Sequence, residues 1–233
     1  MIKLLWVVFI VASLFACSSH IRIHELSKKS KIDASISSSL KIDKLIQPYK
    51  DSLDKEMNQV LGFSKDNFEI QRPSSSLMNW CADAIFANQT KNIKLAQPIF
   101  CLLNTGGLRS TIGKGTVSLG DIYKLMPFDN TIVWVELPIS SIAEIEKYLS
   151  QSGGEPIANA KLENGKLLIN GNNEKMTHFW VITSDYLMNG GDKMSFFEQR
   201  TNAIMNGKLL RNAFIEEVKS QGTLIFNEEV RIK

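Results

Sequence analysis

The sequence predicts an α+β fold in which helices pack against a mixed β-sheet. Apolar residues at helical spacing alternate irregularly with short, continuously apolar runs that are typical of buried strands. Asn164-Gly165 stands between two segments of alternating polarity, a pattern typical of a β-hairpin. With 233 residues, 44% of them hydrophobic, the chain is long enough to form a core without disulfides or metals. We therefore expect one globular domain, or at most two small ones.

The amino-terminal residues indicate a targeting segment. Residues 4–16 form an apolar run that is too short to cross a membrane as a helix, and Cys17 follows it directly. The junction is typical of a bacterial lipobox, whose cysteine is acylated; a plain secretory signal with an incidental cysteine is the alternative. We expect a signal peptide over residues 1–16, a tether over 17–40 and a domain over 41–233, with lipidated Cys17 holding the protein to a periplasm-facing membrane of the cell envelope.

Helices and strands can be placed along the predicted domain in order. The first helix contains Pro48, as its start or as a kink, and Gly62 is expected to stop it. Serine side chains mark later helix starts because they can accept from free backbone amides, and Ser141 with Glu144 has the spacing of a capping box. The expected elements are a helix over 42–60, a short strand over 68–71, a helix capped within 74–76 and reaching 85, a strand over 98–104, a helix over 119–126 capped by Ser118, a strand over 131–137, a helix over 141–149, the hairpin at 164–165, a strand over 179–184, a helix near 208–221 and a closing strand over 223–226.

Charge and residue counts argue against two kinds of function. The 27 basic and 24 acidic side chains give a net charge of +3, spread along the chain, whereas a nucleic-acid partner requires a clustered basic surface. Three histidines are too few for most self-contained hydrolytic metal centres, so we expect neither a metal site nor another cofactor in this chain. Cys81 lies in a helical pattern and Cys101 in an apolar run, where buried free thiols are expected.

Three loops beside predicted strands or helices carry residues of chemical interest. In the first, the Gly106-Gly107 pair allows backbone N–H groups to approach a ligand, and the Arg109 guanidinium suits a phosphate or carboxylate; a tight turn with a solvated arginine is the alternative. The second loop presents Phe128, for which a place in the core is the alternative. The third spans residues 186–192, where a hairpin turn is the alternative. Together the loops would supply two aromatic faces for a base, a carboxylate for ribose and an arginine for phosphate.

Four motifs occur in a fixed order along the chain. They are Ser75-Ser-Leu-Met-Asn-Trp-Cys-Ala-Asp-Ala84, Asn104-Thr-Gly-Gly-Leu-Arg109, Gly120-Asp-Ile-Tyr-Lys-Leu-Met-Pro-Phe-Asp-Asn130 and Asn189-Gly-Gly-Asp192. In sequence and spacing they resemble the C-terminal domain of the 5′-nucleotidase and UDP-sugar hydrolase family, over roughly residues 46–233. The resemblance implies an α+β domain that grips a nucleotide, while a separate metallophosphoesterase domain holds two divalent metals and performs the hydrolysis.

The resemblance implies a phosphate-binding end of the site. Arg109 would contact the substrate phosphate, and Asn104 would shape the site at the start of the loop that holds Gly106 and Gly107. Thr105 stands where the family has a glycine, which adds a side chain at a turn. Arg72 lies one residue closer to the first motif than the family's upstream substrate arginine, so the resemblance implies substrate binding by Arg72 less directly.

The resemblance also implies a base- and ribose-binding end. Phe128 matches one stacking phenylalanine of the family, and Tyr186 stands where the second is usual, so the base would be held between two rings. Asn130 matches a residue close to the base, and Asp192 matches the aspartate that binds ribose.

The sequence leaves three functions open. The first is a lipid-anchored nucleotide-recognition subunit for nucleotide catabolism, which acts with a separately encoded metallophosphoesterase as a split 5′-nucleotidase and is inactive alone. The second is a stand-alone nucleoside- or nucleotide-binding lipoprotein without enzymatic activity. The third is a scaffold whose ligand site has decayed, which fits the departure at Thr105. Nucleotide-dependent thermal stability separates the third from the others, because a ligand that binds only the folded form stabilises it.

Overall fold

The computed structural model describes residues 33, 36–93, 97–171 and 176–233. The predicted signal peptide, Cys17 and most of the predicted tether lie outside these residues. The chain divides into two units, Met1–Ile46 and Gln47–Lys233. Among the residues described, no helix has both the length and the apolar character needed to cross a membrane.

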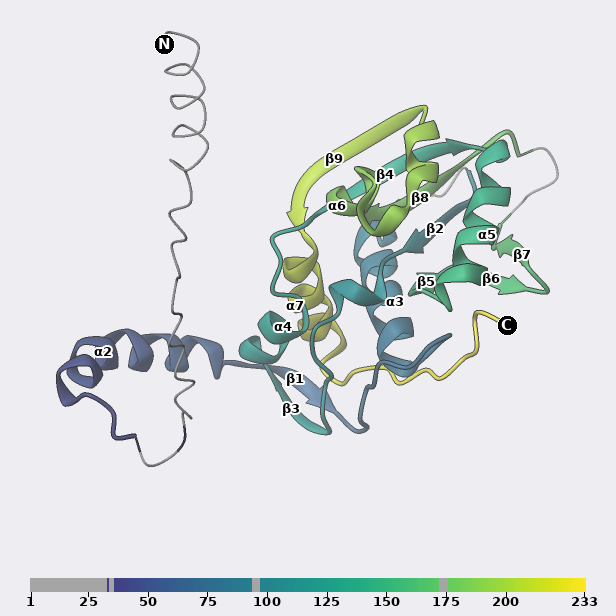
Figure 1. Cartoon of the computed structure of the whole chain (residues 1–233). Helices are drawn as coiled ribbons and strands as arrows, with labels where there is room; N and C mark the ends of the chain where they lie inside the picture. Colours follow the sequence, from purple (N-terminus) through teal and green to yellow (C-terminus); the bar gives the residue numbers. More distant parts are fainter. Residues whose placement is uncertain (1–32, 34–35, 94–96, 172–175) are drawn as a thin grey trace, which may run out of the picture. The chain divides into compact units, whose positions relative to one another are not determined.

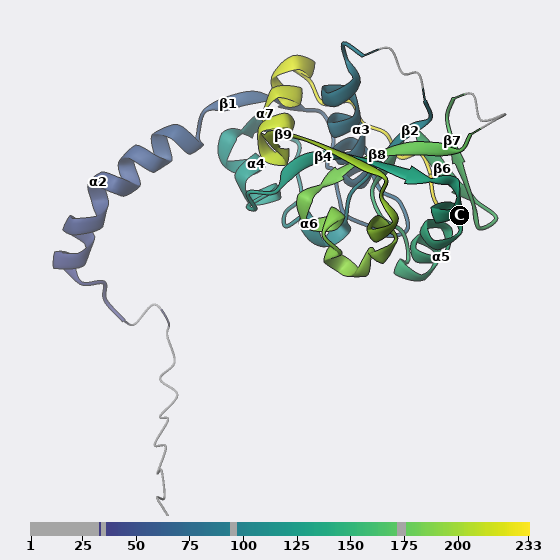
Figure 2. The ribbon, with the colours of Figure 1, turned by 90° about the horizontal axis from the view of Figure 1, so that it is seen from above.

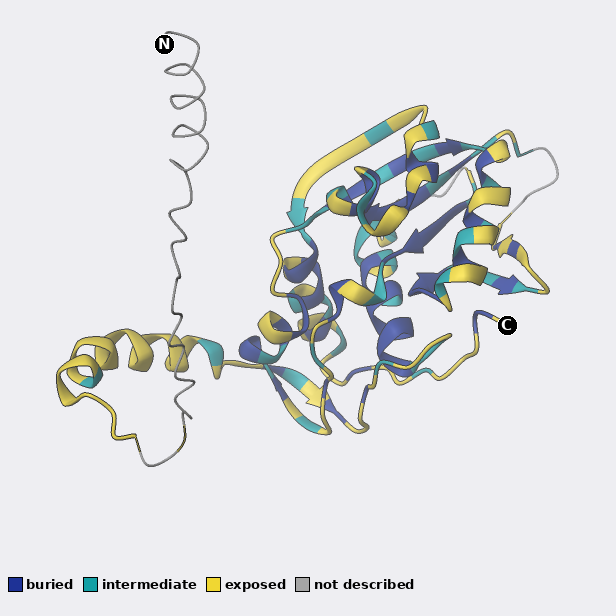
Figure 3. Ribbon diagram, viewed as in Figure 1, coloured by how far each residue is buried: buried dark blue, intermediate teal, exposed yellow. Residues whose placement is uncertain are grey.

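Helix α2 (Leu40–Met57) confirms the first predicted helix, with Pro48 inside it. None of its residues is buried, and its apolar side chains are exposed to solvent except for Met57, which is partly buried against the core (Figure 3). The predicted stop at Gly62 is wrong, because the helix ends at Met57 and Gly62 lies in strand β1 (Val60–Ser64). A glycine is needed there for a packing reason: a Cβ on Gly62 would lie 2.9 Å from the Gly222 carbonyl oxygen.

A five-stranded mixed sheet forms the centre of the unit from Gln47 to Lys233, in the order β5-β2-β8-β4-β9 (Figure 1). Its strands are β2 (Ile99–Leu102), β4 (Thr131–Pro138), β5 (Ile157–Ala158), β8 (His178–Ser184) and β9 (Asn202–Leu209). Strands β2 and β8 are parallel, and the other neighbours are antiparallel. The predicted α+β fold with a mixed sheet is therefore confirmed, and so are the strands expected near 98–104, 131–137 and 179–184.

Helices cover both faces of this sheet (Figure 2). The helices are α3 (Ser76–Thr90), α4 (Leu119–Leu125) and α7 (Leu210–Gln221) on one face and α5 (Ile142–Ser152) on the other. Side chains alternate along β2, so that Cys101 joins the first core while Phe100 and Leu102 join the second. Cys81 and Cys101 are buried free thiols, as expected, and burial raises the pKa of both well above the ordinary value.

Serine caps were predicted correctly at two helices and wrongly at a third. Ser75 caps α3, and Ser118 forms a capping box at the start of α4. Ser141 caps nothing, because it already lies in a 3₁₀ turn (Ile139–Ser141) and its hydroxyl donates to Gln199. The predicted capping box with Glu144 is therefore wrong, although helix α5 itself forms.

The short strand pairs outside the central sheet agree only in part with the sequence prediction. The Asn164-Gly165 hairpin is confirmed between β6 (Ala160–Glu163) and β7 (Lys166–Ile169), and both turn residues have positive φ, 52° and 72°. The strands expected over 68–71 and 223–226 are absent from the described chain as strands, because each contributes only a single bridge. Strand β3 (Gly115–Ser118), which pairs with β1, was not predicted.

Candidate functional site

Three loops meet at one edge of the central sheet because of its topology. Parallel strands β2 and β8 both end at this edge, and antiparallel β4 begins there, with Ile132 paired to Ser184. The loop after β2, the segment before β4 and the short helix α6 (Asp185–Met188) after β8 are thereby brought together. These segments contain the three loops that the sequence analysis selected.

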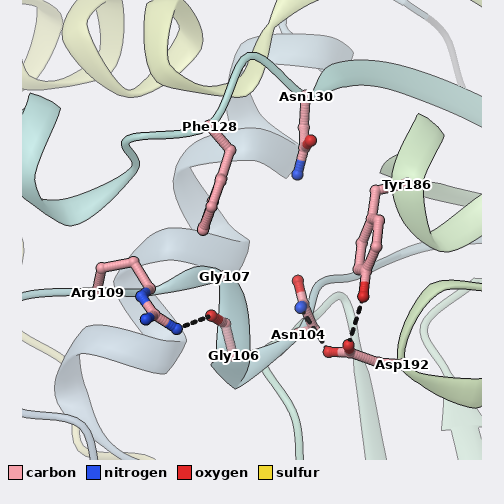
Figure 4. A pocket seen from close by; sticks show the side chains of 8 residues that line it. All are labelled: Asn104, Gly106, Gly107, Arg109, Phe128, Asn130, Tyr186 and Asp192. Carbon is pink, nitrogen blue, oxygen red and sulfur yellow. Dashed lines mark hydrogen bonds between the residues drawn. The ribbon is translucent and has the colours of Figure 1, made fainter. Parts of the chain in front are cut away.

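A pocket of about 370 Å³ opens among these loops (Figure 4). It is lined by Asn104, Gly106, Gly107, Arg109, Phe128, Asn130, Tyr186 and Asp192. All of these are residues that the sequence analysis proposed for substrate binding. Arg72, also proposed there, is not among the lining residues. Its guanidinium instead bonds to the Ser152 carbonyl and to Glu155.

Two aromatic side chains form opposite walls of the pocket (Figure 4). Phe128 is 41% exposed and Tyr186 is 46% exposed, so the alternative that placed Phe128 in the core is wrong. Helix α6 is fixed to the start of β4, since Asp185 accepts bonds from both the amide and the hydroxyl of Thr131. Exposed rings on facing walls suit a flat, partly apolar ligand.

Hydrogen bonds to Asp192 hold the Tyr186 wall in place. The Tyr186 hydroxyl donates to Asp192 Oδ1 at 2.8 Å, and Asn104 Nδ2 donates to Asp192 Oδ2 at 2.6 Å. The segment that carries Asp192 is a 3₁₀ turn (Gly191–Lys193) after α6, so the hairpin alternative for residues 186–192 is wrong. Each carboxylate oxygen keeps a further lone pair for a ligand donor.

The positive charge of the pocket comes from Arg109. Its Nη1 donates to the Gly106 carbonyl at 3.3 Å, and its guanidinium carbon lies 6.0 Å from the centroid of the Phe128 ring. The Gly107 amide already donates to the Asn104 carbonyl at 3.1 Å, which leaves the Gly106 amide as the free one of this pair within the described chain. Arg109 is exposed, and most of its donors remain available to an anion.

Glu155, which sequence reasoning missed, holds the loop that contains Thr105 by hydrogen bonds. Its side chain is 4% exposed, and Oε2 accepts from the Thr105 amide at 2.6 Å and from the Thr105 hydroxyl at 2.8 Å. Arg72 binds the other oxygen at 3.0 Å. The hydroxyl of Thr105 thus has a structural role in this chain. The sequence offers little sign of Glu155 beyond its position after two glycines.

The Tyr186–Asp192 bond has a measurable consequence for pH. Donation to Asp192 raises the pKa of Tyr186 above its ordinary value of 10.0. A group whose folded pKa is raised contributes its stabilisation below the unfolded pKa and loses it as the pH rises through the folded one. We expect the difference in tyrosinate absorbance between the wild type and Tyr186→Phe to titrate above pH 10. A difference that titrates at the ordinary value contradicts the bond, and Asp192→Asn should lower the midpoint.

Comparison with known proteins finds sequence and structural similarity to one protein family. Residues 60–156 match the family model described as 5′-nucleotidase, C-terminal domain. Over these residues the chain is similar to the C-terminal domain of 5′-nucleotidases. Three of the four motifs named above lie within or across the matched residues, and the fourth lies beyond them. The family model thus finds the same resemblance as the sequence motifs, over residues 60–156.

Curated proteins that are similar to this chain are much longer than it. The trifunctional nucleotide phosphoesterase YfkN of Bacillus subtilis is 26% identical over 220 residues, which cover 81% of this chain and 15% of YfkN. Protein UshA of Yersinia enterocolitica is 35% identical over 66 residues, 28% of this chain and 10% of UshA. The chain thus spans a small part of the curated relatives it matches.

Solved structures show the same fold. The 5′-nucleotidase precursor of Thermus thermophilus has a TM-score of 0.66 at 19% identity, covering 82% of this chain and 42% of that one. The NAD nucleotidase of Haemophilus influenzae has a TM-score of 0.59 at 19% identity, covering 86% and 43% respectively. In both, this chain corresponds to less than half of the solved chain.

Proposed function

We propose that this chain is the nucleotide-recognition part of a 5′-nucleotidase-type phosphohydrolase, and that a separate metallophosphoesterase performs the hydrolysis. The observation that carries the proposal is the pocket, in which two exposed rings face each other with Arg109 and Asp192 nearby. A volume of about 370 Å³ lies within the usual range for small-molecule sites.

Each part of a nucleotide has a matching group in this pocket. The base would lie between Phe128 and Tyr186. Stacking on these rings does not depend on which hydrogen-bonding groups the base carries. The Asn130 side chain lines the same space and can both donate to and accept from the edge of a base. Ribose hydroxyls would donate to Asp192, and the phosphate would meet the Arg109 guanidinium.

The comparisons support a nucleotide as the ligand of the proposed site. YfkN is named as a nucleotide phosphoesterase, and the match to this chain covers 15% of it. In the described residues, no group of three or more His, Cys, Asp or Glu side chains is placed to hold a metal ion. As part of the same proposal, lipidated Cys17 would anchor the protein at the cell envelope, where a secreted phosphoesterase can reach it.

Replacement of Arg109 by alanine tests the phosphate end of the site. We expect calorimetry to show AMP and adenosine binding to the wild type, and Arg109→Ala to weaken AMP about tenfold or more while leaving adenosine nearly unchanged. Arg200→Ala is the matched control, because Arg200 is also exposed and also bonds through Nη1 to a carbonyl three residues earlier, outside the pocket. Equal losses for AMP and adenosine would contradict a phosphate role for Arg109.

Reconstitution tests the partner. A secreted metallophosphoesterase from the same organism should hydrolyse AMP faster when this protein is added, and the Arg109→Ala variant should not produce the gain. Tight nucleotide binding with no stimulation of any such enzyme would favour the stand-alone binding lipoprotein. Thermal stability that no nucleotide changes would instead favour a scaffold without a ligand.

A further inference from the structure

We propose that Arg211, at the start of helix α7, is a positioning residue that fixes the Phe128 wall of the pocket. Neither the motifs nor the family match assigns a role to Arg211, which lies outside both. The consequence for ligand binding rests on the proposed function, whereas the contact between Arg211 and the Phe128 segment does not. The two can therefore be tested separately.

The guanidinium of Arg211 donates to three residues of the segment that carries Phe128. Nη1 donates to the carbonyls of Met126 at 3.2 Å and Phe128 at 3.3 Å. Nη2 donates to Asp129 Oδ1 at 2.5 Å, and the guanidinium carbon lies 4.3 Å from the centroid of the Tyr123 ring. A planar fork with several donors can satisfy such a set of acceptors at once.

Helix α7 holds this segment at a second point. The Leu210 amide donates to the Asn130 carbonyl at 3.0 Å. The backbone on both sides of Asp129 is thus bonded to the first two residues of α7. Because Phe128 is 41% exposed, packing covers its side chain only in part. The backbone that carries the ring is therefore held by Arg211 together with Leu210.

Burial of Arg211 costs folding free energy, because one of its donors lacks a partner. The residue is 7% exposed, and its Nε has no hydrogen-bond partner among the described residues. A buried donor without a partner is unfavourable, and an apolar side chain would fill the same space without that penalty. The polar contacts to residues 126–129 are what an apolar side chain at this position would lose.

The test compares Arg211→Lys with Arg231→Lys. Arg231 is a matched control: it is also 7% exposed and also bonds to a carboxylate and a carbonyl, those of Asp83 and Ile157, and it does not line the pocket. Lysine keeps the positive charge but lacks the planar guanidinium that donates to several acceptors at once. Amide exchange is measured over residues 126–130, and adenosine and AMP affinities are measured by calorimetry for each variant.

We expect Arg211→Lys to speed exchange over residues 126–130 and to weaken adenosine and AMP equally, by about tenfold, because stacking on Phe128 is impaired. Arg231→Lys should leave both readouts near the wild-type values. In a Phe128→Ala background, Arg211→Lys should cause no further loss of affinity, since residues that act through one another are not additive. A general loss of structure would not give this pattern.

Three results would overturn the inference: wild-type exchange over residues 126–130 in Arg211→Lys, wild-type adenosine affinity in that variant, or a full additional loss in the Phe128→Ala background. If Arg211→Lys does not fold, Asp129→Ala replaces it, because Asp129 is 79% exposed on its side chain and loses only the Nη2 contact. Asp129→Ala should speed amide exchange and weaken both ligands as Arg211→Lys does, but to a smaller extent. If the wild type binds neither ligand, the proposed function fails, and exchange over residues 126–130 alone decides the role of Arg211.

Discussion

Gly191→Ala is expected to weaken AMP and adenosine binding about tenfold or more without unfolding the protein. A Cβ at this position would lie 2.5 Å from one ring atom of Tyr186 and 2.6 Å from two others. The ring must move, and its 2.8 Å bond to Asp192 breaks. Loss of one stacking face is worth roughly 1–3 kcal/mol for a bound base. Calorimetry with both ligands measures the change.

Gly113→Ala is the control for this variant. Gly113 has open space around its Cβ position and no left-handed φ, so alanine should be tolerated there. Unfolding transitions of both variants should stay close to that of the wild type. Unchanged affinity in Gly191→Ala would show that the Tyr186 ring does not form a wall of the ligand site.

Gly154→Ala is expected to cost about 3 kcal/mol or more of folding free energy. Gly154 has a φ of +101°, and a Cβ there would lie 2.3 Å from the Pro73 carbonyl oxygen and 2.7 Å from its Cα. Backbone cannot yield as a flexible side chain does, so either the segment beside Arg72 or the turn before Glu155 must move. Denaturant unfolding of the variant measures the cost.

The neighbouring Gly153→Ala separates backbone strain from collision. Gly153 has a φ of +76° and ends helix α5, but a Cβ there would lie 3.7 Å from the nearest atom, in the Arg72 side chain. We expect this variant to lose about 1 kcal/mol, the ordinary cost of a left-handed position without glycine. Equal losses in the two variants would contradict the collision with Pro73.

The parts of the site that lie in short contiguous motifs could be predicted from the sequence. The Asn104–Arg109 loop follows an apolar run that can only be a buried strand or helix segment, and glycine with arginine at such an end is a recognisable combination. Exposure of Phe128 was not predictable from residue type, since phenylalanine is usually buried. That the three loops meet required the order and direction of β2, β8 and β4, which local patterns do not fix.

Residues that support the site were missed for a different reason. Arg211 lies in an amphipathic helix, where a single arginine normally indicates the solvent face, and only the tertiary structure places it under another loop. Glu155 likewise has its partner fifty residues away in sequence. Strand β9 escaped detection because most of its side chains are exposed and do not alternate in polarity (Figure 3).

The two pocket rings are held by different parts of the chain: Phe128 by the start of α7, and Tyr186 by Asp192 and by α6. A base seated between them would act as a non-covalent crosslink between these two supports. Neither support needs to be rigid by itself for the liganded site to be rigid. Binding of the base would then order the site, and the conformational entropy lost in that ordering would offset part of the favourable contact with the base.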